Sequence, residues 1–246
     1  MLLYYVRHGD PIYNPDSLTP LGQRQAEAVG RRLATHGMDK IYASPAMRAR
    51  LTGVPLCEML HMDMTVLDWC DEALVWEELT VTYDEHGNKT WAFYHEPTRA
   101  LFRSKEIRAL GDKFYTHPAF EDKKVYGITH FDTGLARVRQ GVDELLASHG
   151  YVRDKESGGF IAEHPNNDRV ALFAHQGFGI AFLSCLLDIP YPAFSTTFDL
   201  SHSSVTVIKL DAPRGKLCFP CALQVANDSH IYHEGLPTKY NNEIFV

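Results

Sequence analysis

Short apolar runs alternate with helix-forming segments at both ends of this chain, and this alternation most constrains its fold. We expect strands at residues 2–6, 40–43, 65–67, 169–174 and 204–210, and helices at 21–37, 45–60 and 178–187. Strands that are joined through helices pair in parallel, with helices on both faces of the sheet. The sequence therefore predicts an α/β fold with a doubly wound, mostly parallel sheet. Residues 216–225 are expected to add an edge strand.

The pattern changes between about residues 76 and 166. Residues 79–94 indicate a hairpin around 86–88, residues 97–117 and 132–150 indicate helices, and residues 151–168 indicate a polar loop. A chain of 246 residues suits one sizeable domain, or a core domain with an insertion. We expect one domain over residues 1–246, with a hairpin-plus-helices insertion at about 76–166 that lies over the ligand-binding edge of the sheet.

Charge and composition exclude several classes of protein. The formal net charge of −7 argues against a nucleic-acid binder or a binder of anionic membranes, both of which need a basic surface. No apolar stretch approaches the roughly 20 residues that span a bilayer. The five cysteines are odd in number and scattered, which argues against a disulfide framework. The expectation is a soluble, cytoplasmic protein.

Polar side chains follow four of the expected strands. They are Arg7 and His8 after the first strand, Ser44 and Arg48 after the second, Asp71 and Glu72 after the third, and His175 and Gln176 after the strand at 169–174. Ligands of open α/β sheets bind at the carboxyl ends of the strands. Two arginines can clamp a tetrahedral oxyanion, a neutral imidazole can attack phosphorus, and a carboxylic acid can protonate a leaving oxygen. This chemistry requires no metal.

Four segments resemble those of a known family, in the family's order. VRHGDPIYN resembles the RHG-motif opening of the histidine phosphatase superfamily, whose fold is phosphoglycerate-mutase-like. LTPLGQRQA, YASPAMRARLTG and ALFAHQGF are similar to its later segments, so the resemblance covers residues 1–72 and about 168–210. It implies that His8 is the phospho-accepting nucleophile. Arg7, Arg48 and His175 would complete the phosphate pocket, with Asn14 beside it.

The resemblance also bears on the proton donor and on the substrate. The segment VLDWCDE is similar to the family's acid segment and places Glu72 at the proton-donor position, with Asp71, Glu77 and Glu78 as alternatives. Three further side chains are candidates for the substrate site. They are Gln176, which replaces a glycine of the family's HGG; His202, just before the strand at 204–210; and Trp76, the aromatic residue best placed to wall the leaving group.

The expected function is that of a histidine-type acid phosphatase. It would be a metal-independent phosphomonoesterase that acts on a small phosphorylated metabolite through a phosphohistidine at His8, without a cofactor, and releases inorganic phosphate. Three alternatives stay open: a cofactor-dependent phosphoglycerate-type mutase, a non-catalytic phospho-ligand-binding module, and a metal-dependent hydrolase. The substrate and the oligomeric state, including a homo-oligomer, are open as well.

Overall fold

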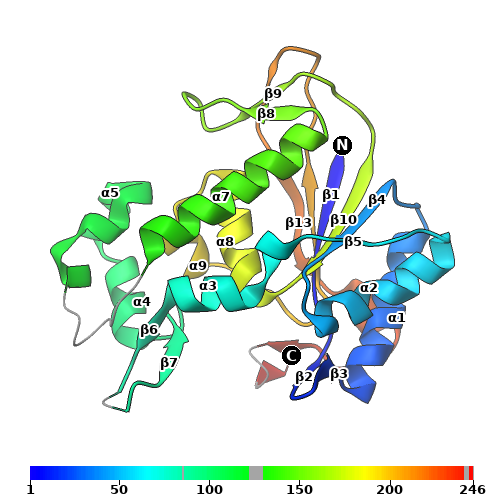
Figure 1. Ribbon diagram of the computed structural model, residues 1–246, viewed down its shortest axis with the longest axis horizontal. Coiled ribbons are helices and arrows are strands. Elements are labelled where there is room, and N and C mark those ends of the chain that lie inside the picture. The colour runs from blue at the N-terminus through cyan, green and yellow to red at the C-terminus, as the bar shows by residue number, and fades with distance from the viewer. Residues whose placement is uncertain (85, 122–129, 241–243, 246) are drawn as a thin grey trace.

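The computed structural model describes residues 1–84, 86–121, 130–240 and 244–245. Its central sheet has the strand order β13 (Cys221–Asn227), β11 (Val205–Lys209), β1 (Leu2–Arg7), β10 (Arg169–Ala174), β4 (Lys40–Ala43) and β5 (Thr65–Val66). Strands β1, β10, β4 and β5 are parallel, while β11 and β13 run antiparallel to their neighbours. The predicted α/β fold with a mostly parallel sheet is confirmed (Figure 1).

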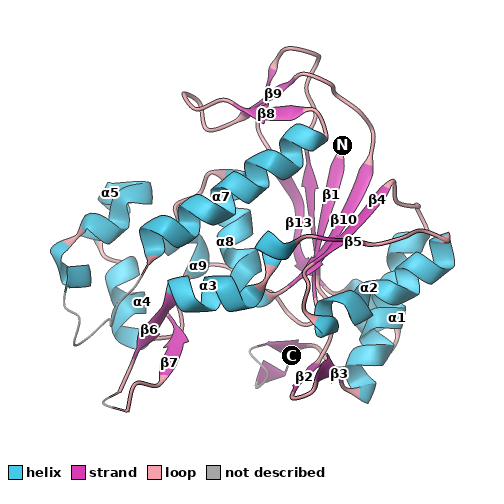
Figure 2. Ribbon diagram, viewed as in Figure 1, coloured by secondary structure: helices cyan, strands magenta, loops and turns pink. Residues whose placement is uncertain are grey.

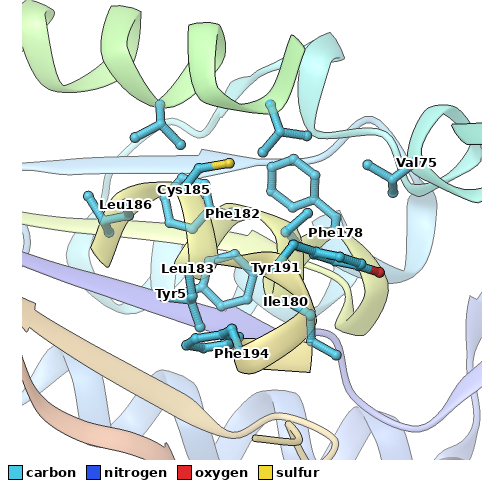
Figure 3. Packing of buried hydrophobic residues seen from close by; sticks show 14 of the residues in the cluster. Tyr5, Val75, Phe178, Ile180, Phe182, Leu183, Cys185, Leu186, Tyr191 and Phe194 are labelled. Carbon is cyan, nitrogen blue, oxygen red and sulfur yellow. The ribbon is translucent and has the colours of Figure 1, made fainter. Parts of the chain in front are cut away.

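Helices cover both faces of the sheet, as Figure 2 shows. On β1, Leu3 and Tyr5 pack into one apolar cluster and Tyr4 and Val6 into the other, because successive side chains of a strand point to opposite faces. The first cluster includes side chains of α7 (Phe131–Ser148) and α8 (Gln176–Leu187), and Figure 3 shows Tyr5 among the α8 residues. The second includes side chains of α1 (Pro20–Ala34) and α2 (Met47–Leu60).

The segment predicted as an insertion begins inside α3 (Glu72–Leu79). Its described elements are β6 (Thr80–Thr82), β7 (Lys89–Trp91), α4 (Glu96–Phe102), α5 (Lys105–Leu110), two 3₁₀ helices at Gly111–Thr116 and Pro118–Glu121, and α7. The expected hairpin is present as β6 and β7, which are antiparallel. Residues 122–129 lie outside the described residues. The extent of a single domain over residues 1–246 stays a prediction.

The prediction of a polar loop at 151–168 is wrong. Strands β8 (Tyr151–Arg153) and β9 (Phe160–Ala162) form a hairpin, and β12 (Leu217–Cys218) adds a third strand to it. Tyr151 and Phe160 are buried, which stabilises two strands too short to stand out in a polar sequence. The edge strand expected at 216–225 is divided into two strands that belong to different sheets. β12 pairs with β9, and β13 pairs with β11 of the central sheet.

Short elements complete the fold. They are β2 (Pro11–Tyr13), β3 (Asp16–Leu18), the 3₁₀ helix at Asp68–Cys70, α9 (Tyr191–Ser195), α10 (Ser229–His233), β14 (Lys239–Tyr240) and β15 (Ile244–Phe245). Within the described ranges, no helix is both long enough and apolar enough to cross a membrane.

Candidate active site

Parallel strands β1 and β10 bring two histidines to the same edge of the sheet. Arg7 is in register with Ala174, so that His8 and His175 follow at the same level. The backbone N–H of His8 donates to the backbone carbonyl of Ala174 at 2.8 Å, and the imidazole centroids of His8 and His175 lie 5.3 Å apart. The structure thus brings together the two histidines that the sequence placed at separate strand ends.

The imidazole of His8 is held in one tautomer. Its Nδ1 lies 2.7 Å from the carbonyl oxygen of Gly9, and a carbonyl can only accept, so Nδ1 carries the proton and Nε2 presents a lone pair. Burial lowers the pKa of His8 well below its usual value, and the neighbouring His175, Arg7 and Arg48 lower it further. His8 is therefore neutral at neutral pH, the form that can act as a nucleophile.

Two arginines lie close enough to the histidines to lower the pKa of both electrostatically. Arg7 donates from Nη1 to the carbonyl of Leu200 at 2.5 Å, and Arg48 lies between Asp16, at 3.0 Å, and Glu72, at 3.2 Å. The Nε atoms of both arginines are buried and have no hydrogen-bond partner among the described residues. Buried N–H donors are costly to leave unpaired. An oxyanion at this position would satisfy them, and the planar guanidinium suits phosphate oxygens.

Glu72 connects the arginine, the second histidine and a helix N-terminus. Its Oε1 accepts the backbone N–H of Gly177 in the first turn of α8 at 2.9 Å, and its Oε2 lies 3.4 Å from Nδ1 of His175. His175 is fixed from its other side by Ser44, whose Oγ is 2.6 Å from Nε2. Polar atoms of His8, Glu72 and His175 all lie within 4.8 Å of one another.

The other carboxylates considered as proton donors have different partners. Asp71 lines the cavity, but its Oδ1 also caps α3 by accepting the N–H of Ala73 at 3.0 Å. Glu77 is exposed and pairs with Lys89 at 2.5 Å. Both oxygens of Glu78 accept from Arg137, at 2.8 and 2.6 Å. Of the four candidates, Glu72 is the one grouped with His8.

Arg7, His8 and His175 are buried, and of the grouped site residues Arg48 and Glu72 reach an adjoining cavity of about 840 Å³. It is lined by Tyr13, Asp16, Pro45, Ala46, Arg48, Asp71, Glu72, Ala73, Trp76, Thr90, Trp91 and Tyr94. Trp76 lies in its wall, as the sequence predicted for an aromatic beside the leaving group. It packs edge-on against Trp91, with ring centroids 4.9 Å apart.

Asn14 does not lie in the wall of this cavity. It is exposed at the turn between β2 and β3, and the residues of that hairpin that line the cavity are Tyr13 and Asp16. Tyr13 and Asp16 form a cross-strand pair, so their side chains share a face. Sequence analysis missed both residues, although the dipeptide Asn14-Pro15 is a turn signal that could have indicated this pairing.

Gln176 is not among the residues that line the cavity, and it lies behind the wall against Tyr94. Its Nε2 donates to the hydroxyl of Tyr94 at 2.5 Å and to Oδ1 of Asp199 at a shorter distance. Tyr94 in turn donates to Oδ2 of Asp199 at 3.2 Å. The glutamine that replaces a family glycine thus fixes Tyr94, a lining residue that sequence analysis also missed.

His202 is buried against the nucleophile. Its ring centroid lies 5.8 Å from that of His8, and its Nδ1 is 3.3 Å from Oδ1 of Asp10. Asp10 also pairs with Lys239 at 3.1 Å. Like His8, His202 is not among the residues that line the cavity. Burial, with Arg7 adding to it, lowers the pKa of His202 to about 4.

The buried histidines predict that the protein loses stability in acid. The pKa of His202 is about 4 in the fold and 6.5 without perturbation, so between these values the unfolded chain binds a proton that the folded chain does not. The free energy of unfolding therefore falls as pH drops below about 6.5, by about 2 kcal/mol at pH 5 from this group alone. Urea unfolding at pH 7 and pH 5 measures the loss. His202→Asn should lose less than wild type, and an equal loss in both proteins would contradict this assignment.

His8, Glu72 and His175 are also the described side chains that could jointly hold a metal ion. Their surroundings oppose this, because Arg48 already pairs with Glu72 and both Arg7 and Arg48 lower the pKa of His8 electrostatically. A positive potential at Nε2 of His8 attracts an anion and repels a divalent cation.

Comparisons with known proteins bear on the family and the fold. The model of the histidine phosphatase superfamily (branch 1) matches residues 3–152 of the chain. No curated protein matches the sequence.

Solved structures with the same fold include three phosphatases. The mycobacterial glucosyl-3-phosphoglycerate phosphatase has a TM-score of 0.59 and 24% identity, over 92% of this chain and 99% of its own. The phosphoserine phosphatase of Entamoeba histolytica, in complex with 3-phosphoglyceric acid, has a TM-score of 0.55 and 18% identity, over 94% and 98%. The alpha-ribazole phosphatase of Shigella flexneri has a TM-score of 0.57 and 16% identity, over 92% and 96%. At these identities the likeness shows the fold.

Proposed function

The chain belongs to the histidine phosphatase superfamily, branch 1, and from this premise we propose that it is a metal-independent phosphomonoesterase acting through a phosphohistidine at His8. One observation carries the proposal. His8 presents Nε2 as its unprotonated nitrogen, its imidazole is grouped within 4.8 Å with polar atoms of Glu72 and His175, and Arg7 and Arg48 act on it electrostatically. The Nε atoms of both arginines have no hydrogen-bond partner within the described part of the chain. This set can hold a phosphoryl group and attack it.

The reaction has two steps in this proposal. Nε2 of His8 attacks phosphorus as the bond to the alcohol oxygen breaks, and the carboxylic acid of Glu72 gives its proton to that oxygen. Water then attacks the phosphohistidine, the Glu72 carboxylate takes a proton from it, and the nitrogen–phosphorus bond breaks to release inorganic phosphate and neutral His8. Arg7, Arg48 and His175 hold the phosphoryl oxygens in both steps, which stabilises the charge that develops on them.

A cytoplasmic location is part of the proposal. The five cysteines are free, as is usual for proteins of a reducing compartment. The expected partners are a small phosphomonoester and inorganic phosphate. Inorganic phosphate is also the ligand named for one solved structure of the mycobacterial relative.

The proposal predicts phosphate release that survives removal of metal ions. We expect the purified protein to hydrolyse 4-nitrophenyl phosphate, with a rate in EDTA within about twofold of the rate without it, because the arginines supply the positive charge that a metal would supply elsewhere. The release of inorganic phosphate and of 4-nitrophenol measures both rates.

Three results would replace this proposal with one of its alternatives. Loss of activity in EDTA that is restored by a divalent cation would indicate a metal-dependent hydrolase. Binding of phosphate without turnover of any phosphomonoester would indicate a non-catalytic binding module. Fast isomerisation of 3-phosphoglycerate with its bisphosphate primer, without free phosphate, would indicate a mutase.

A further inference from the structure

The outer part of the cavity is walled by aromatic rings. Trp76, Trp91, Tyr94 and Tyr13 all line it, and none of the first three is fully buried. The indole ring of Trp91 packs against Gly177 in the first turn of α8. A Cβ at this position would lie 2.3 Å from the ring, so the close packing requires glycine. Aromatic faces that are held in place and partly open to solvent bind flat, apolar ring surfaces.

The charges in the same wall are mostly negative. The lining contains the carboxyl groups of Asp16, Asp71 and Glu72, of which Glu72 is protonated at the start of the proposed reaction, and among the described lining residues Arg48 is the one arginine or lysine. Arg48 already pairs with Asp16 at 3.0 Å and with Glu72 at 3.2 Å. A carboxylate on the leaving group would therefore meet Asp71 without a cation to compensate for the repulsion.

Tyr94 is fixed by a second acidic residue behind the wall. Its hydroxyl and the amide of Gln176 both donate to Asp199, which also accepts the backbone N–H of Leu200 at 2.7 Å. This network keeps the phenol in the wall and adds negative charge behind it. The wall thus offers the leaving group the aromatic surface of Tyr94.

We propose that the substrate is the phosphate ester of an uncharged or positively charged alcohol that carries a flat ring, with the ring against Trp76. The inference rests on the proposed function, since it assumes that the phosphoryl group binds at His8. It implies that esters carrying a carboxylate, such as 3-phosphoglycerate, are poor substrates. The ring can be aromatic or a sugar with an apolar face, because both stack on indole.

Esters that differ in one feature test the inference. We expect kcat/KM for benzyl phosphate to exceed that for 4-carboxybenzyl phosphate and for propyl phosphate at least tenfold each. The ester 4-(aminomethyl)benzyl phosphate should equal or exceed benzyl phosphate. Cyclohexylmethyl phosphate shows whether a saturated ring suffices, and thus distinguishes an aromatic ring from a sugar-like one.

Two variants and one control locate the effects. Trp76→Ala should lower kcat/KM for benzyl phosphate more than for propyl phosphate. The control Tyr232→Ala, which removes a largely exposed aromatic ring from α10, should change neither. Asp71→Asn should raise kcat/KM for the carboxybenzyl ester relative to benzyl phosphate. Asparagine caps a helix as well as aspartate does, so α3 keeps its N-terminus.

The outcomes separate this inference from the proposed function. Hydrolysis of the carboxybenzyl ester at the rate of benzyl phosphate, or equal loss of both alkyl esters in Trp76→Ala, overturns the inference and leaves the phosphatase in place. If no ester is hydrolysed, the proposed function fails. Calorimetric binding of the same esters to wild type then still tests the charge and ring preferences, and equal affinities would overturn them.

Discussion

Replacing His8 with alanine is expected to lower kcat/KM for any phosphomonoester by about 10⁴-fold or more. The reason is that the proposed reaction forms a bond between phosphorus and Nε2 of His8, and the described site contains no second nucleophile in the same position. His175 is the nearest other imidazole, but its Nε2 is 2.6 Å from the hydroxyl of Ser44 and its Nδ1 faces Glu72.

Acid quenching or base quenching of the reaction with ³²P-labelled ester measures the same prediction directly. Wild type should carry label that is lost in acid and kept in base, as expected of a phosphohistidine, and His8→Ala should carry none. His233→Ala is the matched control, since this histidine is exposed on α10 and should leave labelling unchanged. A thermal melt establishes that His8→Ala is folded, and label that persists in folded His8→Ala would refute the mechanism.

The grouping of Arg7, His8, Arg48, Glu72 and His175 was predictable because it depends on local features of the sequence. Arg7, His8 and His175 follow directly after buried strands, and parallel strands end at one edge of a sheet. Arg48 and Glu72 lie in the first turns of helices that begin at the same edge. Once the strands are known, these positions follow from topology alone.

The outer part of the site was less predictable because it depends on contacts between distant residues. Tyr94 forms hydrogen bonds with Gln176 across 82 positions and with Asp199 across 105. No periodicity or spacing in the sequence indicates such pairs. For Asn14 a local motif was misleading. The motif suggested that Asn14 lies at the site, but Tyr13 and Asp16, which pair across the hairpin, line the cavity and Asn14 does not.

Replacing Glu72 with glutamine is expected to lower kcat for an alkyl phosphate by about 10²–10³-fold, within the range that general acid catalysis contributes. Glutamine has the same shape and can still accept the N–H of Gly177, so the loss should reflect the missing proton. The loss should be much smaller for 4-nitrophenyl phosphate, because 4-nitrophenolate leaves without being protonated. A stopped assay for phosphate on both esters measures the two ratios.

This dependence on the leaving group separates the proton donor from a residue that merely shapes the site. Glu77→Gln is the control, because Glu77 is exposed and pairs with Lys89. This variant should hydrolyse both esters at the wild-type rate. Asp71 lines the same cavity but caps α3, so Asp71→Asn should affect both esters alike. If the selective loss on alkyl phosphate appeared in Asp71→Asn and not in Glu72→Gln, the proton would come from the helix cap, and Glu72 would serve to orient Arg48 and His175.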